Sequence, residues 1–487
     1  MVFGTMSKAF AQIGARFRLD PFANIFQSFI EETLVEQDKD QYRQGTILTP
    51  TLLVWLVLAL TLRRDLSYPK VLNWMVSGFR WLKLKLPSKS AVVEDGAISH
   101  ARVKLGFETF RDLFYKQGTC FQSIEPDFHG RVSVAFDGAT GSMPDTECNV
   151  EAFNKPSSRS GSAAFPQLRM MTLMALSVRL MLDVAYAPYA GKGTGERALV
   201  MQILGRLAHK GLVFLMDAGL YSFEIVWEID QADQEFIIKA PKTVKPKHIE
   251  TLPDGSYLAQ LSKKVPDPDA PPMKNGRKRW KRVTQTVRVI RFEIPGFQPV
   301  TLVTNILDTS TTAREIALHY HQRWDIEIAY DEIKTHQCAT LRGQPPTTFR
   351  SKRPDLVKQE LYAMLIMYNL VRLLIRQAAE KHNKDPRLIS FLDALQHIIE
   401  AAPLMTVDDS AHSQKRNLFW YLLQVIADCD IDRPRRHRIN PRVVKVKMSK
   451  FKRKNKLHKP EKRNLEQELK IVWANSTATM REAMSMA

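Results

Sequence analysis

The strongest constraint on the fold is an alternation of short apolar runs with one helical segment in the first half of the chain. Apolar runs at 132–136, 170–178 and 181–186 predict three strands. A helical pattern that ends at Gly211 follows, and then a fourth strand at 212–216. Alternation of this kind is typical of α/β folds, in which sites collect at the carboxyl ends of the strands.

Two of the predicted strands end in an aspartate. Asp137 follows the first run and Asp217 follows the fourth. Each acid alone is a weak signal, because Asp-Gly after an apolar run is more often a turn than a ligand. As a pair at strand ends, they predict an acidic site at one edge of the sheet.

The stretch YHQRWDIEIAYDEIKTH at 320–336 predicts a helix with four polar groups on one face. The offsets 0, 3, 7 and 14 belong to Tyr320, Arg323, Glu327 and Lys334. At about 100° per residue, these positions fall within about 60° of one another. The stripe therefore combines a phenol, a guanidinium, a carboxylate and an ammonium group.

Two simpler interpretations of this helix stay open at this point. Glu327 could pair with Arg323 in a surface ion pair worth a few tenths of a kcal/mol. Asp331 lies roughly 20° from Tyr320, so position alone does not choose Glu327 over Asp331. Three carboxylates on a basic protein would suit two Mg²⁺ ions, the arrangement that phosphodiester cleavage uses.

Composition indicates a polyanionic partner. The net charge is +20 and the pI is about 9.7, which favours nucleic acid or an anionic membrane. The longest apolar run, 52–62, is too short to cross a bilayer and predicts a buried helix that Thr49 caps and Pro50 begins. The four cysteines are far apart with no C-x-x-C pair, and we find no secretory signal, so we expect no membrane association and a cytoplasmic protein.

The segment 433–463 concentrates this charge. It has fifteen Lys and Arg residues and one acid, so it carries +14 of the +20. A solvated tail is the simple interpretation, but its interspersed prolines and apolar residues predict an extended arm along a phosphate backbone.

The chain divides into regions of different texture. We expect a helical DNA-binding domain at 1–120 and a catalytic domain at 121–380, interrupted by a β-rich insertion at about 223–306. A helical C-terminal region at 381–487 would contain the basic arm 433–463.

The spacing of Tyr320, Arg323, Glu327 and Lys334 resembles the Y-R-E-K signature of the bacterial insertion sequence four family of DDE transposases. The surrounding motifs agree: FDGAT contains Asp137, LMDAGLYS contains the second aspartate, and TNILD precedes the signature. AFNKP, AFPQLR and the NPRVVK tail are also similar to the family. The resemblance runs from about residue 20 to 465.

The resemblance implies an α/β RNase H-like catalytic core, a mixed sheet with helices that a β-rich insertion interrupts, between helical N- and C-terminal regions. It implies a catalytic and metal-binding triad of Asp137, Asp217 and Glu327, which chooses Glu327 over Asp331. The cofactor would be two Mg²⁺ ions, with Mn²⁺ as a substitute. Arg323 and Lys334 would bind phosphates of the transposon end, and the Tyr320 hydroxyl would bind a phosphate near the cut.

Further DNA contacts are expected from basic and aromatic side chains. Core packing is the alternative for Trp324, whereas Trp280 lies among cations and favours stacking on a base. The full set of additional expected contacts is Trp324, Trp280, Arg277, Arg279, Lys155 and Arg159.

These features predict a cut-and-paste or related transposase that cleaves transposon ends and transfers strands into target DNA. Its partner would be double-stranded DNA, both inverted-repeat ends and target, and the family implies a homodimer that pairs two ends. One alternative is a metal-dependent DNase or resolvase on the same fold. The other is a domesticated DNA-binding protein without activity, against which the intact triad argues.

Overall fold

The computed structural model describes most of the chain. The described residues are 22–43, 46–75, 77, 93–118, 124–158, 161–267, 279–337, 348–405, 412–431, 443–444, 452–453 and 464–473. They form two compact units. Unit 1 takes the described residues up to 125 together with 136–206 and 325–431, and unit 2 takes 126–135, 207–324 and those after 431. In the described part, no helix is long and apolar enough to span a membrane.

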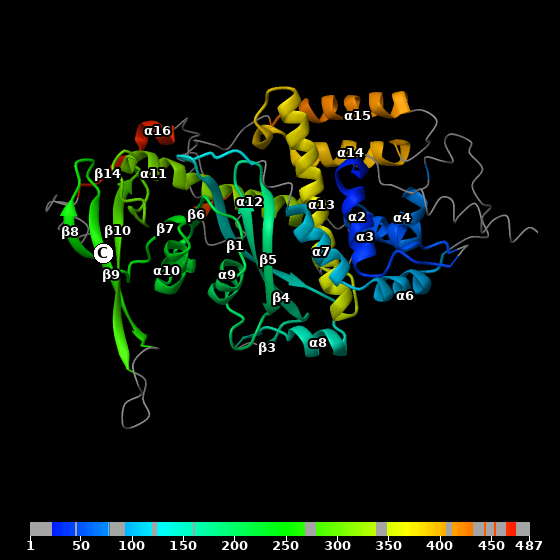
Figure 1. The fold of residues 1–487 in the computed structure, drawn as a ribbon, viewed down its shortest axis with the longest axis horizontal. Coiled ribbons are helices and arrows are strands. Elements are labelled where there is room, and N and C mark those ends of the chain that lie inside the picture. Colours follow the sequence, from blue (N-terminus) through cyan, green and yellow to red (C-terminus); the bar gives the residue numbers. More distant parts are fainter. Residues whose placement is uncertain are drawn as a thin grey trace, which may run out of the picture. The chain divides into compact units, whose positions relative to one another are not determined.

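Unit 1 is built around the long helix α13 (Pro354–Lys381), which packs against helices from both ends of the sequence (Figure 1). Its neighbours include α3 (Pro50–Leu62), which is buried from Leu52 to Leu62. The Thr49 hydroxyl accepts a hydrogen bond from the Leu52 N–H at 3.3 Å, so the predicted cap and buried helix are confirmed. The other helices are α2 (Ala23–Glu36), α4 (Tyr68–Met75), α6 (Asp95–Leu105), α7 (Glu108–Gln117), α8 (Glu147–Phe153), α14 (Phe391–Met405), α15 (His412–Ala427) and the 3₁₀ turn η5 (Pro386–Leu388).

The strands of unit 1 lie in the order β5-β4-β1. β4 (Gln167–Ala175) and β5 (Leu180–Pro188) form an antiparallel hairpin, and α9 (Glu196–Leu204) packs on both. The prediction that this helix runs to Gly211 is wrong. It ends at Leu204, with Gly205 at the C-cap, because glycine is a poor helix former. Beyond the helix, the Arg206 guanidinium donates to the Asp183 carboxylate at 2.6 and 3.1 Å. The small ladder β2 (Ser157–Ser158) with β3 (Gly161–Ser162) completes the set.

Strand β1 (Val132–Ser142) contributes residues to both units. In unit 2, Val132 to Ala135 pair in parallel with β6 (Leu212–Met216), and β6 pairs in parallel with β7 (Glu235–Lys239). The prediction that β1 ends at Asp137 is wrong, because the strand continues to Ser142. What ends before Asp137 is the ladder with β6, whose last pair is Ala135–Leu215.

The rest of unit 2 is an antiparallel extension of this sheet. The order continues as β7-β11-β10-β9-β8, and β14 (Lys470–Ile471) pairs with β10. The region predicted as a β-rich insertion begins with a helix, α10 (Phe223–Gln231), before its strands. These strands are β8 (Lys247–Thr251), β9 (Tyr257–Pro266), β10 (Trp280–Glu293) and β11 (Val300–Thr304). The short elements η2 (Ala218–Leu220), β12 (Val443–Val444), β13 (Lys452–Arg453) and α16 (Leu465–Glu468) are also described.

The signature stretch is not one regular α-helix, so that prediction is wrong. It consists of α11 (Ala313–Tyr320), a 3₁₀ turn η3 (His321–Arg323), α12 (Trp324–Asp331) and a π-helical turn η4 (Glu332–Gln337). A capping box between Thr312 and Glu315 starts α11. Because 3₁₀ and π turns advance by different angles from an α turn, the constant 100° step does not apply across the stretch.

Candidate active site

The first predicted catalytic acid, Asp137, is half-buried within β1. One of its carboxylate oxygens accepts a hydrogen bond from the Gly138 backbone N–H at 2.9 Å. Its backbone carbonyl accepts a hydrogen bond from the hydroxyl of Tyr330 at 3.0 Å. Both the side chain and the peptide group of Asp137 are therefore held in place.

The second predicted acid, Asp217, directly follows β6 and is exposed. It precedes the 3₁₀ turn η2, and its side chain makes no capping hydrogen bond to that turn. The Tyr320 hydroxyl donates to the Met216 carbonyl at 3.1 Å, which fixes the backbone just before Asp217. Tyr320 is 8% exposed. An ionised phosphate oxygen accepts hydrogen bonds, so Tyr320 can bind DNA in this way only if its hydroxyl proton moves from Met216 to the phosphate. The contact of Tyr320 with DNA stays a prediction.

The third predicted acid, Glu327, is half-buried on α12. Its rival Asp331 is exposed, and its carboxylate accepts a hydrogen bond from the Thr335 hydroxyl at 2.7 Å. Two other acids bracket Glu327 along the chain, Asp325 and Glu332, and both are buried. The sequence interpretation did not single out either of them.

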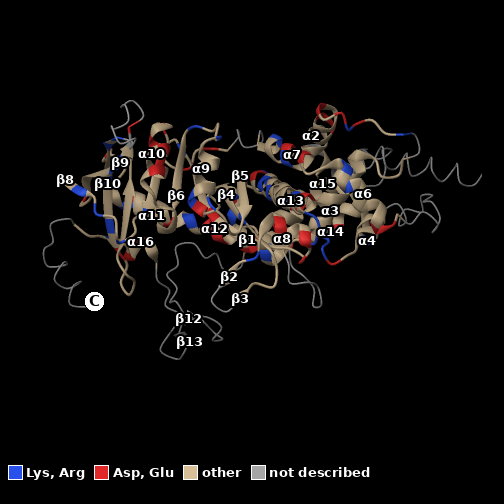
Figure 2. Ribbon diagram, turned by 90° about the horizontal axis from the view of Figure 1, so that it is seen from below, with Lys and Arg blue, Asp and Glu red and all other residues tan. Residues whose placement is uncertain are grey.

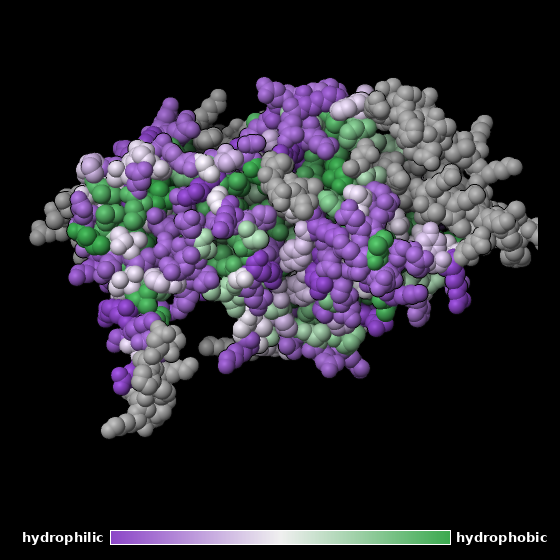
Figure 3. Space-filling model, in the orientation of Figure 1, coloured by the Kyte–Doolittle hydropathy of each residue, from purple (hydrophilic) through white to green (hydrophobic). Residues whose placement is uncertain are grey.

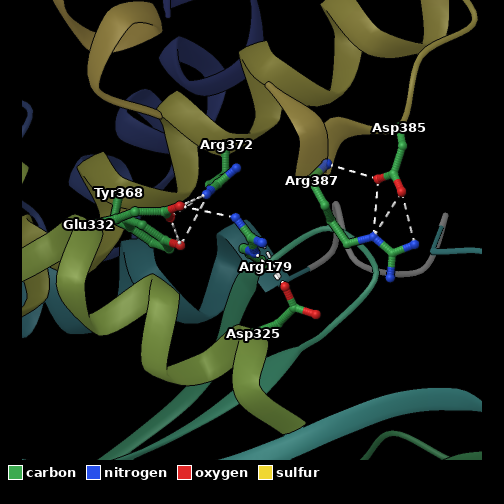
Figure 4. Close-up of polar contacts among 7 residues, drawn as sticks. All are labelled: Arg179, Asp325, Glu332, Tyr368, Arg372, Asp385 and Arg387. Atoms are coloured by element: carbon green, nitrogen blue, oxygen red, sulfur yellow. Dashed lines mark hydrogen bonds and ion pairs between the residues drawn. The ribbon is translucent and has the colours of Figure 1, made fainter. Parts of the chain in front are cut away.

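These two bracketing acids are bound to arginines in the interior of unit 1 (Figure 4). Arg179 donates through Nε and Nη2 to one oxygen of Asp325, at 3.0 and 2.6 Å, and through Nη1 to Glu332 at 3.1 Å. Arg372 and the Tyr368 hydroxyl both donate to the other Glu332 oxygen, at 3.1 and 2.9 Å. Two arginines thus balance two acids, and the carboxylates at both ends of α12 are held.

Burial and the neighbouring charge act in opposite directions on Arg372. Burial alone lowers the pKa of its guanidinium, but Glu332 and Tyr368 together outweigh burial and leave the pKa above its usual value. For the Tyr368 phenol, burial has the opposite effect and raises the pKa. The arginine stays charged and the phenol stays protonated, so both remain donors to Glu332 at working pH.

Arg179 adopts an uncommon backbone conformation to reach this network. It lies in the turn between β4 and β5 with φ of 53°, in the left-handed region that residues other than glycine seldom occupy. Its side chain is 4% exposed. The ion pairs that the Arg179 guanidinium makes with two buried carboxylates, Asp325 and Glu332, offset the strain of this turn.

A fourth carboxylate lies beside the first catalytic candidate. The side chain of Glu196, the first residue of α9, lies close to Gly138: its Oε1 is 3.2 Å from the position that a β-carbon there would occupy. A glycine after Asp137 therefore lets this side chain approach β1. No sequence pattern singles out Glu196, since an acid in the first turn of a helix is common.

The three predicted acids have the donor chemistry of a site for a hard divalent cation, because Mg²⁺ prefers carboxylate oxygens. Across the described ranges, no group of three His, Cys, Asp or Glu side chains lies close enough together to hold a metal ion. Their fit to a cation therefore rests on the type of donor they supply.

The remaining signature residues differ in burial. Arg323 is 8% exposed and its guanidinium lies 5.7 Å from the ring centre of Trp324. Trp324 is 54% exposed, so the alternative of core packing is wrong. Lys334 is exposed, with Nζ 5.1 Å from the ring centre of Tyr330. Contact with DNA stays a prediction for these three residues.

Lys and Arg residues occur along the hairpin of β9 and β10, where the ribbon is blue in Figure 2. On the face that Figure 3 shows, the described surface over this hairpin is mixed, with an apolar patch surrounded by hydrophilic residues. Trp280, at the start of β10, is 60% exposed and follows the exposed Arg279. Lys155 forms an ion pair with Asp145 at 2.7 Å. Arg277, Arg159 and nearly all of the arm 433–463 lie outside the described residues.

The family of the chain follows from comparison with known proteins. A family model described as "Transposase DDE domain" matches residues 129–370, which include all three predicted acids. A second model, "Insertion element 4 transposase N-terminal", matches residues 18–115. The chain belongs to the insertion element 4 family of DDE transposases.

A curated relative and a solved structure are similar to this transposase. "Transposase InsG for insertion sequence element IS4" of Escherichia coli (strain K12) is 28% identical over 409 residues, which cover 82% of this chain and 86% of the relative. The cryo-EM structure of a piggyBac transposase synaptic complex with hairpin DNA has a TM-score of 0.41 and 12% identity, and covers 84% of this chain and 86% of that one.

Membership of the family confirms several sequence predictions. The protein is an enzyme, a DDE transposase, with an RNase H-like α/β core and helical flanking regions. It binds DNA, and the family depends on a divalent metal ion.

Proposed function

We propose that this transposase cuts DNA at the ends of its transposon and joins the freed ends to target DNA, with Asp137, Asp217 and Glu327 as its catalytic carboxylates. One observation carries the proposal. The parallel ladder of β1 with β6 ends at Ala135–Leu215, and each aspartate follows its own member of that pair by two residues. Equivalent positions after two parallel strands are where α/β enzymes place their reacting groups.

The residues of the chain would divide the work. The three carboxylates would hold two Mg²⁺ ions, or Mn²⁺ in their place, which supply charge stabilisation for the attacking and leaving oxygens. Arg323 and Lys334 would bind phosphates of the transposon end and keep the scissile bond in line. The phenol of Tyr320 would position a phosphate near the cut.

The DNA partner would be contacted over a wider surface. We assign Trp280, Trp324, Arg277 and Arg279 to bases and phosphates near the end, because exposed aromatic rings beside cations suit splayed DNA. Lys155 and Arg159 would contribute further phosphate contacts, and the arm 433–463 would follow the backbone. Two copies of the chain would pair two transposon ends, as a homodimer.

The test is a cleavage and joining assay on a transposon-end duplex taken from the inverted repeats that flank this gene. Asp137→Ala, Asp217→Ala and Glu327→Ala should each abolish nicking in Mg²⁺ and in Mn²⁺, while binding of the end persists. Asp331→Ala is the matched control and should cleave, because its carboxylate is exposed and bonds locally to Thr335. Full cleavage by any of the first three variants would remove that residue from the proposed set.

The same assay separates a transposase that joins strands from a plain nuclease. Joined products, in which the freed 3′ end of the transposon is covalently attached to a target plasmid, are expected with the wild-type chain. Nicked products without joined ones would favour the DNase or resolvase alternative. Binding without cleavage under every metal condition would favour a silent DNA-binding protein.

A further inference from the structure

A chain of hydrogen bonds in the interior of unit 1 ends on the peptide group of Asp137. The hydroxyl of Tyr330, on α12, lies 3.0 Å from the Asp137 carbonyl oxygen. The same hydroxyl lies 2.8 Å from the hydroxyl of Thr172, on β4. Thr172 is fully buried and Tyr330 is 6% exposed, so water does not compete for these contacts.

The direction of each hydrogen bond in this chain can be assigned. A carbonyl oxygen only accepts, so the single Tyr330 proton goes to Asp137. The Tyr330 oxygen then has no proton for Thr172, and the Thr172 hydroxyl must donate to it. The order is therefore Thr172 to Tyr330 to Asp137.

This series of hydrogen bonds ends at Asp137, one of the proposed catalytic residues, and so can influence the site. The register between β1 and β6 ends at Ala135, two residues before Asp137. Tyr330 supplies a side-chain donor to the Asp137 carbonyl. It lies one helical turn after Glu327 on α12, so the same hydrogen bond links the segment that carries the proposed glutamate to the strand that carries the proposed aspartate.

We infer that Tyr330 and Thr172 are positioning residues, which fix the backbone of Asp137 against α12 without touching DNA. The inference rests on the proposed catalytic role of Asp137. Groups that do not bind the metal but orient a metal-binding residue by hydrogen bonds are important for the site. Their removal by mutation typically lowers metal affinity or activity by about 10- to 100-fold. A misplacement of about 1 Å at a reacting group is enough for an effect of this size.

The alternative is a tyrosine that merely stabilises the fold. Loss of its hydroxyl would then lower the melting temperature, and every folded molecule would keep its normal affinity for metal. A matched control is Tyr115→Phe. The Tyr115 hydroxyl also bonds within unit 1, to the Asp183 carboxylate at 3.1 Å, but Asp183 is not among the proposed catalytic residues.

The experiment measures Mn²⁺ binding to the full chain in complex with a transposon-end duplex by electron paramagnetic resonance, and cleavage in parallel. Tyr330→Phe should weaken Mn²⁺ binding and slow nicking by about 10-fold or more, while its affinity for the end stays within about two-fold of wild type. Hydrogen exchange of the peptide that spans β1 should accelerate at Gly138. Tyr115→Phe should leave all four measurements unchanged: Mn²⁺ binding, nicking, affinity for the end and hydrogen exchange.

Thr172 provides a second test if Tyr330→Phe fails to fold. Thr172→Ser keeps the donor to Tyr330 and should bind Mn²⁺ like wild type, whereas Thr172→Val removes the donor and should weaken binding. Wild-type Mn²⁺ affinity in both Tyr330→Phe and Thr172→Val would overturn the inference. Asp137→Asn is the reference for the proposed function itself: if it cleaves normally, Asp137 is not catalytic, whatever the result at Tyr330.

Discussion

The guanidinium of Arg179 donates two hydrogen bonds to one carboxylate oxygen of Asp325, at 2.6 and 3.0 Å, in the interior of unit 1. The two side chains are 4% and 5% exposed. The same guanidinium reaches Glu332, so one arginine on the β4–β5 turn holds carboxylates near both ends of α12. The segment that carries Glu327 is thus anchored at two points in unit 1.

This anchoring predicts a large loss of stability for Arg179→Met. The change removes the ion pairs of Arg179 with Asp325 and with Glu332. Breaking a buried ion pair from one side costs about 3–5 kcal/mol. Urea unfolding measures the effect. The control is Arg376→Met, since Arg376 pairs with the exposed Glu380 on the surface of α13 and such a pair contributes about 1 kcal/mol or less. Equal losses in the two variants would contradict the role of burial.

A second prediction concerns the close packing of β1. Gly141 is buried in this strand, and a β-carbon there would overlap the ring of Phe349 and lie 3.1 Å from its Cζ atom. Phe349 is 1% exposed and cannot move into solvent. Gly141→Ala should therefore destabilise the protein by about 1–3 kcal/mol.

Thermal or urea unfolding checks this prediction against Gly96→Ala. Gly96 lies in α6 with no atom within 4 Å of the added carbon, so alanine there should be neutral or stabilising by up to about 1 kcal/mol. The double variant Gly141→Ala/Phe349→Leu should recover part of the loss. No recovery would mean that the clash is not with Phe349.

The fold and the site differ in how far the sequence predicts them. The α/β core follows from local apolar patterns, and the cap at Thr49 from the residue type, because both depend on neighbours in the chain. Local patterns do not predict that the signature stretch changes helix type at His321 and at Glu332. The periodicity carries no information on the burial of Tyr320, Arg323 and Glu332.

The site features that could not be predicted from the sequence depend on contacts between residues that are far apart along the chain. Tyr330 looks like an ordinary apolar-face residue of a helix, and its hydrogen bond to Asp137 joins residues 193 positions apart. Arg179 looks like a surface residue of a hairpin turn, and its partner Asp325 is 146 positions away. The triad itself was accessible only through resemblance, since strand-end aspartates are common.

A pH prediction follows from the start of α11. The carboxylate of Asp254 accepts hydrogen bonds from the Ala313 N–H and the Ser256 hydroxyl, both at 2.6 Å, and pairs with the buried Arg288. Burial alone would raise the pKa of Asp254, but the hydrogen bonds from Ser256 and Ala313 together outweigh it, and the pKa lies below its usual value. A depressed pKa adds stability above the unfolded-state value, near 3.9, which is lost as the pH falls through the lower folded-state value.

Asp254→Asn should therefore cost about 1–3 kcal/mol at pH 7, and the difference from wild type should shrink below pH 4. Unfolding by urea at a series of pH values measures it. Asp355→Asn is the control, because the Asp355 side chain is 67% exposed and pairs with Lys358 on the same helix. A difference for Asp254→Asn that stays constant to pH 2.5 would show that the charge is not responsible.

A substitution of Trp280, at the start of β10, can distinguish a role in DNA contact from a role in packing. Trp280 is 60% exposed, so Trp280→Ala should leave the melting temperature almost unchanged. If the ring stacks on a base, affinity for a transposon end with unpaired terminal bases should fall by about 1–3 kcal/mol. Trp420→Ala, on α15, removes a ring that is 44% exposed and should leave this affinity unchanged. Equal affinity of all three proteins would exclude stacking by Trp280.

The role of the basic arm 433–463 is best tested by substitutions that remove its charge, and not by truncation of the chain. A chain that stops before residue 433 would also lose β14, which pairs with β10, and the Leu469 carbonyl that accepts from Arg314 at 2.9 Å. Such a chain would lose packing in unit 2 together with the charge, so weaker binding would not identify the arm as the cause.

Replacing Lys452, Lys454, Lys456 and Lys459 by Gln removes four of the arm's charges and keeps the chain length. Each phosphate contact contributes about 0.9 to the slope of log affinity against log salt concentration, so the slope should become shallower by up to about 3.6. The matched control carries Arg at the same four positions, and because it keeps the charge it should keep the slope. A slope that is unchanged in the Gln variant would mean that these lysines do not contact phosphates. An equal reduction in the Arg variant would mean that the arm recognises DNA by side-chain shape and not by charge.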